Sequence, residues 1–142
     1  MPSQLIIIAD SVRDQLNATA FSQAFVAIRH YEPTYDLHAM PDLHVSVVPR
    51  AVSSKSLDRS RDSFDYEIDI AVQKKTESTL SNLDALMELV EEIADHLRLN
   101  GLATYPAAHC VQVSHQPIYS SDHLHEFRVF TSVLSATYRV WR

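Results

Sequence analysis

Glycine is almost absent from this chain of 142 residues, in which Gly101 is the only one. Loops that cradle phosphate groups use several glycines, because a backbone without side chains lets its N–H groups approach the ligand closely. Two-residue hairpin turns also favour glycine, because they require positive φ angles. The sequence therefore excludes a P-loop and a dinucleotide-binding fingerprint, and we expect no cofactor. It also predicts strands that are joined by longer loops.

The rest of the composition is typical of a single globular domain. Hydrophobic residues make up 46% and charged residues 21% of a chain long enough to bury a core without disulfides or metal. The net charge of −6 and the three lysines do not favour a protein that grips nucleic acid. Cys110 is the only cysteine, so no disulfide forms within the chain and a reducing compartment fits best. No neighbouring sequence signal indicates an activated thiol, so we expect Cys110 to be a buried, unreactive strand residue.

The N-terminal segment was a candidate for a targeting signal. The apolar run at residues 5–9 has five residues, and Asp10 and Arg13 follow it directly. This run is too short for a secretion signal or a membrane span. We therefore expect a protein that stays in the cytoplasm of the cell that makes it and has no membrane partner.

Hydrophobic periodicity divides the chain into two helices and five strands. The predicted helices are residues 3–16 and 81–99. The predicted strands are residues 21–31, 43–48, 64–75, 110–114 and 127–141. The last strand is apolar on both faces in its middle, which predicts a central place in a sheet or a place between the sheet and a neighbouring subunit. This order predicts an α+β fold, with a mainly antiparallel mixed sheet of about five strands and two helices packed on one face.

The strongest patterns are those of residues 64–75 and 81–99. In the strand, apolar side chains alternate with polar ones, so one face packs on a core and the other meets water or a polar partner. In the helix, one apolar stripe at helical spacing stands opposite an acidic face. These two elements should form the centre of the fold.

Residues 51–63 show no periodicity and are rich in serine. The sequence predicts a mobile loop that becomes ordered when it meets a partner. Its charged residues are the candidate assembly contacts: Lys55, Asp58, Arg59, Arg61 and Asp62. Because acidic residues interrupt the basic ones, a protein partner is favoured over nucleic acid.

Asp65, Glu67 and Asp69 form a row of carboxylates along the predicted strand 64–75. A row of this kind is most often a solvated face. Paired carboxylates also perform acid–base chemistry or bind hard cations, but the partners for such chemistry are missing here. In a ring-shaped assembly, the same row would face the lumen or an adjacent subunit, and in the lumen it would repel DNA phosphates.

Eight histidines raise the question of a metal or catalytic site. His123 and His125 would project to the same side of an extended segment and could bind zinc, but spacing places no third ligand. His44, with Ser46 two residues later, resembles half of the paired signature of two-histidine phosphoesterases, and no second half follows. We therefore expect no metal and no enzyme. A small phosphoesterase that uses His44 with His123 or His125 stays as the alternative from another class.

The order of the elements, the strand sequence of residues 65–75 and the segment 128–134 resemble the tail terminator and neck proteins of tailed bacteriophages. The resemblance spans most of the chain and implies a small α+β subunit that assembles as a ring, commonly a hexamer. It implies a place in the virion, on top of the tail tube, where the ring ends tube polymerisation and joins the head.

The resemblance carries no catalytic residues. The implied partners are further copies of the chain, the tail tube protein and the head–tail connector or stopper proteins, and DNA would pass through the lumen without specific binding. A head-completion protein of the same neck is the alternative within this class. Tyr138 and Trp141 are aromatic residues of a kind enriched at interfaces, although simple core packing explains them equally well.

Overall fold

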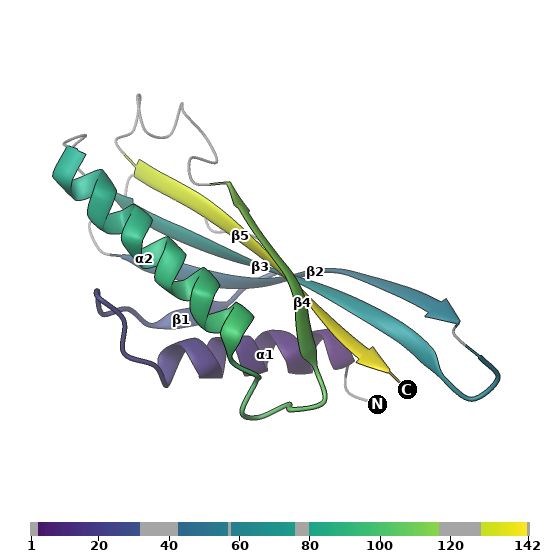
Figure 1. The fold of residues 1–142 in the computed structure, drawn as a ribbon. Coiled ribbons are helices and arrows are strands. Elements are labelled where there is room, and N and C mark those ends of the chain that lie inside the picture. The colour runs from purple at the N-terminus through teal and green to yellow at the C-terminus, as the bar shows by residue number, and fades with distance from the viewer. Residues whose placement is uncertain (1–2, 32–42, 57, 76–79, 117–128, 142) are drawn as a thin grey trace.

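The computed structural model describes residues 3–31, 43–56, 58–75, 80–116 and 129–141. Its elements follow the predicted order of one helix, three strands, one helix and two strands (Figure 1). They are α1 (Gln4–Asn17), β1 (Ala27–Arg29), β2 (His44–Ser56), β3 (Asp62–Lys75), α2 (Leu80–Leu99), β4 (His109–Gln116) and β5 (Val129–Trp141). The predicted α+β class is confirmed.

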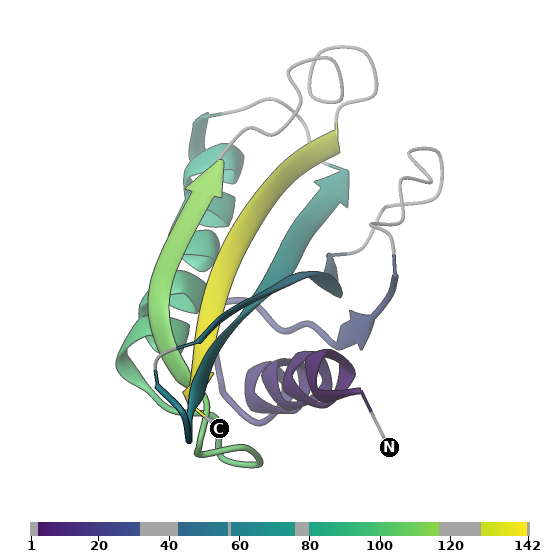
Figure 2. The ribbon, with the colours of Figure 1, turned by 90° about the vertical axis from the view of Figure 1, so that its right-hand side faces the viewer.

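The five strands form one mixed sheet in the order β1-β2-β3-β5-β4. β1 runs parallel to β2, and every other neighbouring pair is antiparallel. Figure 2 shows β4, β5 and β3 curving together side by side. β5 lies between β3 and β4, in the central position predicted from its apolar character.

Both helices pack on the same face of this sheet and share one hydrophobic core with it. α1 lies against β1 and β2, whereas α2 lies against β4 and β5. The apolar side chains of β3 that point into this core are Tyr66, Ile68, Ile70 and Val72. The alternation predicted for residues 64–75 is thus confirmed, and the opposite face of the sheet carries the polar residues of the same strand.

The first helix begins where the sequence predicts. The Ser3 hydroxyl accepts a hydrogen bond from the backbone N–H of Ile6 and caps the helix (3.4 Å). Ile8, Val12 and Leu16 are buried on one side. The β-branched run in this helix does not turn it into a strand, because the helical spacing of the buried side chains decides the packing.

The predicted strand at residues 21–31 is mostly wrong, because only Ala27–Arg29 pairs with the sheet. The preceding segment is instead held to α2, where Ser22 donates to Glu92 from both its N–H and its hydroxyl. Asn17 then acts as a strand partner for Ala27, since its side-chain oxygen accepts from the Ala27 N–H (2.7 Å) and its amide donates to the Ala27 carbonyl (3.1 Å).

The prediction of a strand that ends at residue 48, followed by a loop over residues 51–63, is also wrong. β2 continues to Ser56 and pairs with β3 along its whole length, with a bulge between Pro49 and Ala51. Pro49 is tolerated because β1 pairs only with residues 45–47, so β2 is an edge strand at Pro49. Lys55 therefore lies on β2 and Asp62 on β3, and the connection between them shrinks to residues 57–61.

Candidate assembly surface

The hairpin of residues 51–63 projects from one end of the sheet, beyond both helices (Figure 1). Ser63 pairs with Trp141 in the last rung between β3 and β5. Beyond that rung, β2 and β3 pair only with each other among the described residues. All six residues of β2 from 51 to 56 are exposed. Residues 51–55 of the segment that the sequence marked as an assembly contact therefore form the exposed edge of the sheet beside β3, and only residues from 56 to 62 extend beyond β5.

The turn of the hairpin is organised by Asp58. Its Oδ1 atom accepts hydrogen bonds from the Ser60 N–H (2.7 Å), the Arg61 N–H (2.8 Å) and the Ser60 hydroxyl (3.0 Å). These bonds, the one from the Ser60 N–H above all, hold the pKa of Asp58 below its usual value. A side chain that satisfies the backbone in this way replaces the glycine that the turn lacks.

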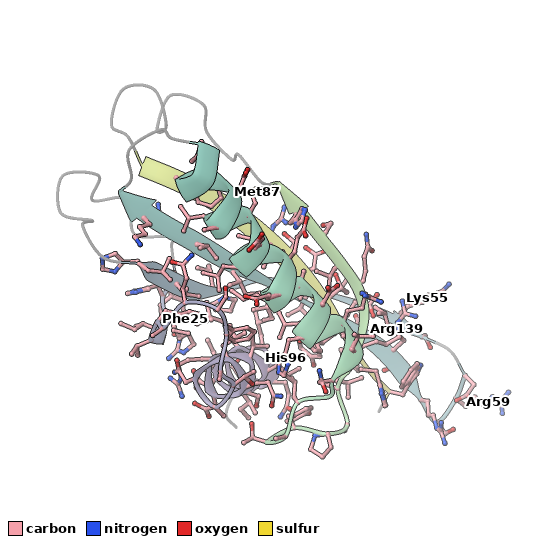
Figure 3. The ribbon with its side chains drawn as sticks, turned by 60° about the vertical axis from the view of Figure 1, so that its left-hand side comes forward. Phe25, Lys55, Arg59, Met87, His96 and Arg139 are labelled. Atoms are coloured by element: carbon pink, nitrogen blue, oxygen red, sulfur yellow. The ribbon has the colours of Figure 1, made fainter. Side chains whose placement is uncertain are left out.

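The hairpin carries three basic residues. Lys55, Arg59 and Arg61 are exposed, and none of them forms an ion pair with a residue that the structure describes. Asp58 is engaged with the backbone and forms none of the ion pairs either. Figure 3 shows Lys55 and Arg59 at the projecting end of the molecule. The hairpin therefore presents both signs of charge, with the cations of Lys55, Arg59 and Arg61 beside the carboxylates of Asp58 and Asp62.

The predicted row of carboxylates lies on the face of the sheet opposite the helices, and two of its three members are paired. The Arg139 guanidinium binds Asp65 through two hydrogen bonds, Nε to Oδ1 at 2.8 Å and Nη2 to Oδ2 at 3.2 Å. These bonds hold the pKa of Asp65 below its usual value and raise the pKa of Arg139. The paired strands bring these two residues together across 74 positions of sequence.

Asp69 is held by a second set of contacts. The Ser135 hydroxyl donates to Asp69 Oδ1 (2.7 Å), and Arg50 Nη1 lies 3.7 Å from the same oxygen. Glu67, between the two pairs, has no ion pair with any described residue. Because Arg50 and Arg139 offset two of the three negative charges, this polar face is close to neutral, a property that the row of carboxylates alone did not predict.

A groove of about 510 Å³ runs along this face at the base of the hairpin. Its lining combines side chains of three strands: Ser53, Ser54, Lys55, Ser63, Asp65, Arg139 and Trp141. Trp141 is 43% exposed and lies beside the His109 ring, with 5.5 Å between the ring centroids. The groove thus contains an accessible tryptophan ring, a residue type that is enriched at protein interfaces.

The two candidate interface aromatics lie in different surroundings. Trp141 is accessible, as an interface residue has to be. Tyr138 is fully buried among the core side chains, and burial raises the pKa of its hydroxyl. In this conformation Tyr138 cannot contact a neighbouring subunit, so core packing explains it.

The residues considered for catalysis do not come together in the described part of the chain. His44 is exposed at the start of β2, and the segment with His123 and His125 lies outside the described residues. Within those residues, no three potential metal ligands gather in one place. Cys110 is half-buried on β4, and burial raises the pKa of its thiol.

No helix among the described residues combines the length and apolar character that crossing a membrane requires. No family model matches the chain, and no curated protein matches it at a significant level. Among solved structures, the chain is similar to the sheath/tube terminator of an extracellular contractile injection system (PVC), determined by cryo-electron microscopy in its extended state, with 12% identity and a TM-score of 0.49. The match covers 100% of this chain but 58% of that chain. A similarity this distant assigns neither a family nor a function.

Proposed function

We propose that this chain is a structural, non-catalytic subunit that forms a ring at the end of a phage tail tube, where it ends tube polymerisation and joins the tail to the head. The observation that carries the proposal is the division of the molecule into a covered core, a polar sheet face without helices, and a projecting hairpin. The sequence resemblance to tail terminators supports the same role. A ring subunit needs surfaces for its neighbours, and the hairpin with its groove provides one.

In this ring, the helix-free face of the sheet lines the lumen. Asp65 and Asp69 are offset by Arg139 and Arg50, and Lys55 on the same face balances the charge of Glu67. A nearly neutral wall neither holds DNA phosphates nor repels them strongly over its whole length. DNA would therefore pass without specific binding. The ring in this proposal is a hexamer of this chain. Its other partners are the tail tube protein and the neck proteins on the head side.

Electron microscopy of the purified protein and of tails that contain it tests the proposal. We expect ring-shaped particles in solution or at one end of the tail. Removal of the protein should produce tube-containing tails of abnormal length, because nothing ends tube polymerisation. Tails of normal length that fail to join heads would instead favour the head-completion role. A protein that is monomeric both in solution and in the particle would overturn the proposal.

A further inference from the structure

The sheet has two long strand edges that pair with no described residue. One edge is residues 51–56 of β2, because β1 pairs only with residues 45–47 of that strand. The other is the side of β4 that faces away from β5. The two edges stand on opposite sides of the sheet, with β3 and β5 between them. An unpaired strand edge is a template for another chain, because its N–H and C=O groups can extend the ladder.

One hydrogen bond identifies the backbone groups that point out of the sheet along β2. His30 donates from its N–H to the Val47 carbonyl (2.9 Å), so the backbone of Val47 faces β1 and not β3. In an antiparallel pair, residues alternate between bonding the partner strand and pointing away from it. Counted along β3 from the partner of Val47, Val52 and Ser54 also point away from β3. Pro49, which has no N–H to donate, stands at another of these outward positions.

The same alternation crosses the sheet to β4. Ile70 of β3 stands opposite Val47, so its backbone bonds β5, where its partner is Leu134. The backbone of Leu134 therefore faces β3 and not β4. His115 lies opposite Leu134, and Val113 lies two residues before His115. The N–H and C=O groups of Val113 and His115 thus point toward the open edge of β4.

The side chains along both edges do little to keep other strands away. Edge strands are commonly protected by charged residues, proline or bulges. Residues 111–116 contain no Lys, Arg, Asp, Glu or Pro, and the bulge of β4 lies at the start of the strand. On β2, Lys55 is the only charged residue from 51 to 56. Val52 and Val111 leave apolar surface at the two edges, with exposures of 49% and 43%.

We propose that residues 51–56 of one copy pair with residues 111–116 of β4 in the next copy, in an antiparallel ladder. β2, β3, β5 and β4 alternate in direction, so β4 of a copy placed in the same orientation runs antiparallel to β2. In this register Val52 meets His115 and Ser54 meets Val113, so outward groups bond outward groups. Because paired residues share one face, the helices of both copies stay on the same side of the sheet.

A second copy is favoured as the partner because one repeated contact covers both edges. Pairing of either edge with itself would form a two-fold dimer and leave the other edge open. A contact between two different edges is head-to-tail, and it closes into a ring or continues as a filament. The inference rests on the proposed ring and deepens it by naming the two strands that join its subunits. It also turns the helix-free faces of all copies to one side, as the proposed lumen requires.

Engineered cysteines test the register of this ladder. In a chain with Cys110→Ala, the double variant Ser53→Cys with Ser114→Cys places two thiols opposite each other across the joint. Within one copy β3 and β5 separate these positions, so the disulfide forms only between copies. With copper phenanthroline as the oxidant, we expect a ladder of linked chains on non-reducing gels. Ser53→Cys with Gln112→Cys is the matched control, and its shift of two residues should slow the linking about tenfold or more.

Single-cysteine variants separate this contact from two-fold pairing. In the same Cys110→Ala chain, Ser53→Cys alone and Ser114→Cys alone should stay unlinked. The two variants assembled together should give linked pairs that contain one chain of each. Linked pairs of either variant alone would show that an edge pairs with its own copy, and this would overturn the inference.

Proline variants test the ladder without an added bond. Ser54→Pro and His115→Pro each remove an outward N–H and leave the hydrogen bonds within the chain in place. Each should weaken self-association about tenfold or more, as measured by sedimentation velocity over a range of concentrations. Ser54→Ala and His115→Ala keep the N–H, so these matched controls should associate like the natural protein. Both side chains are exposed, and circular dichroism checks that every variant is folded.

The outcomes separate this ladder from the ring itself. If rings form, neither proline variant weakens them and the double-cysteine variant stays unlinked, the two edges do not pair, and the ring is held by another contact. If the natural protein associates neither in solution nor on tails, the inference and the proposed function fail together.

Discussion

The two halves of β2 have opposite surroundings, although they form one continuous strand. In the first half, Val45 and Val47 are buried in the core that the helices cover, beside β1. In the second half, every residue from 51 to 56 is exposed, and among the described strands only β3 pairs with it. The first half exists because it buries apolar surface. The second half exists because its backbone hydrogen bonds extend a ladder that the first half has already set in register.

The bulge between Pro49 and Ala51 marks the border between the halves. Val47 pairs with Ile70 and Val52 pairs with Tyr66, so both valines stand on the helix-facing side of the sheet. A strand without the extra residue would turn Val52 to the other face. The comparison teaches that the same face of one strand is part of the core at one end and accessible surface at the other. The difference lies in what covers the strand.

The largest predicted effect separates the two valines. Val47→Ala should lower the free energy of unfolding by about 2 kcal/mol, because Val47 has 0% exposure and leaves a cavity in the core. Val52→Ala, at 49% exposure, should change it by less than about 0.5 kcal/mol. Urea denaturation of both variants measures this. Equal losses would contradict the division, and a loss for Val52→Ala that appears only at high protein concentration would mean that association buries the hairpin.

A smaller effect concerns the helices that cover the core, and it depends on pH. His96 lies between the helices, with Nε2 3.0 Å from the Gln15 amide nitrogen and 3.2 Å from the Thr19 hydroxyl. Burial lowers the pKa of His96 in the folded protein. In the unfolded chain, histidine has a pKa of about 6.5. The unfolded state therefore binds more protons than the folded state, and the free energy of unfolding should fall as the pH drops below that value.

Urea midpoints at pH 7.5 and at pH values down to 5 measure this dependence. His96→Gln removes the titrating ring, so the variant should lose the part of the pH dependence that belongs to this window. The hairpin residues lie far from His96, as Figure 3 shows for Arg59, and reversal of their charges should leave the dependence in place. A variant His96→Gln with the full natural pH dependence would show that another group is responsible.

The smallest effect on stability belongs to the hairpin turn. Asp58→Ala removes the acceptor of three hydrogen bonds, so amide hydrogens of residues 58–61 should exchange faster with solvent. Global unfolding should hardly change, because the turn buries no core residue. Hydrogen exchange followed by mass spectrometry measures the first quantity and urea denaturation the second. A large loss in global stability would mean that the hairpin and the core unfold as one unit.

Sequence alone determined the elements that bury one face. The alternation in β3 and the helical stripe in α2 are local patterns with a period set by backbone geometry, so they can be read without knowledge of the partner. The predicted start of α1 at residue 3 is the residue that caps the helix. The scarcity of glycine correctly indicated that the connection between β2 and β3 is longer than two residues. The charged residues of the hairpin were also identified, although the segment was assigned to a loop.

Only the tertiary structure decided what surrounds those residues. A strand segment that is exposed on both faces needs no alternation of apolar and polar side chains. No hydrophobic pattern therefore distinguishes residues 51–56 from a loop. The pairing of Asp65 with Arg139 depends on the order β3-β5 in the sheet, which no local pattern encodes. Asp58 accepts hydrogen bonds from backbone N–H groups of the turn, a role that no local pattern predicts. Local periodicity determined the core, whereas contacts between distant segments determined the surface proposed for assembly.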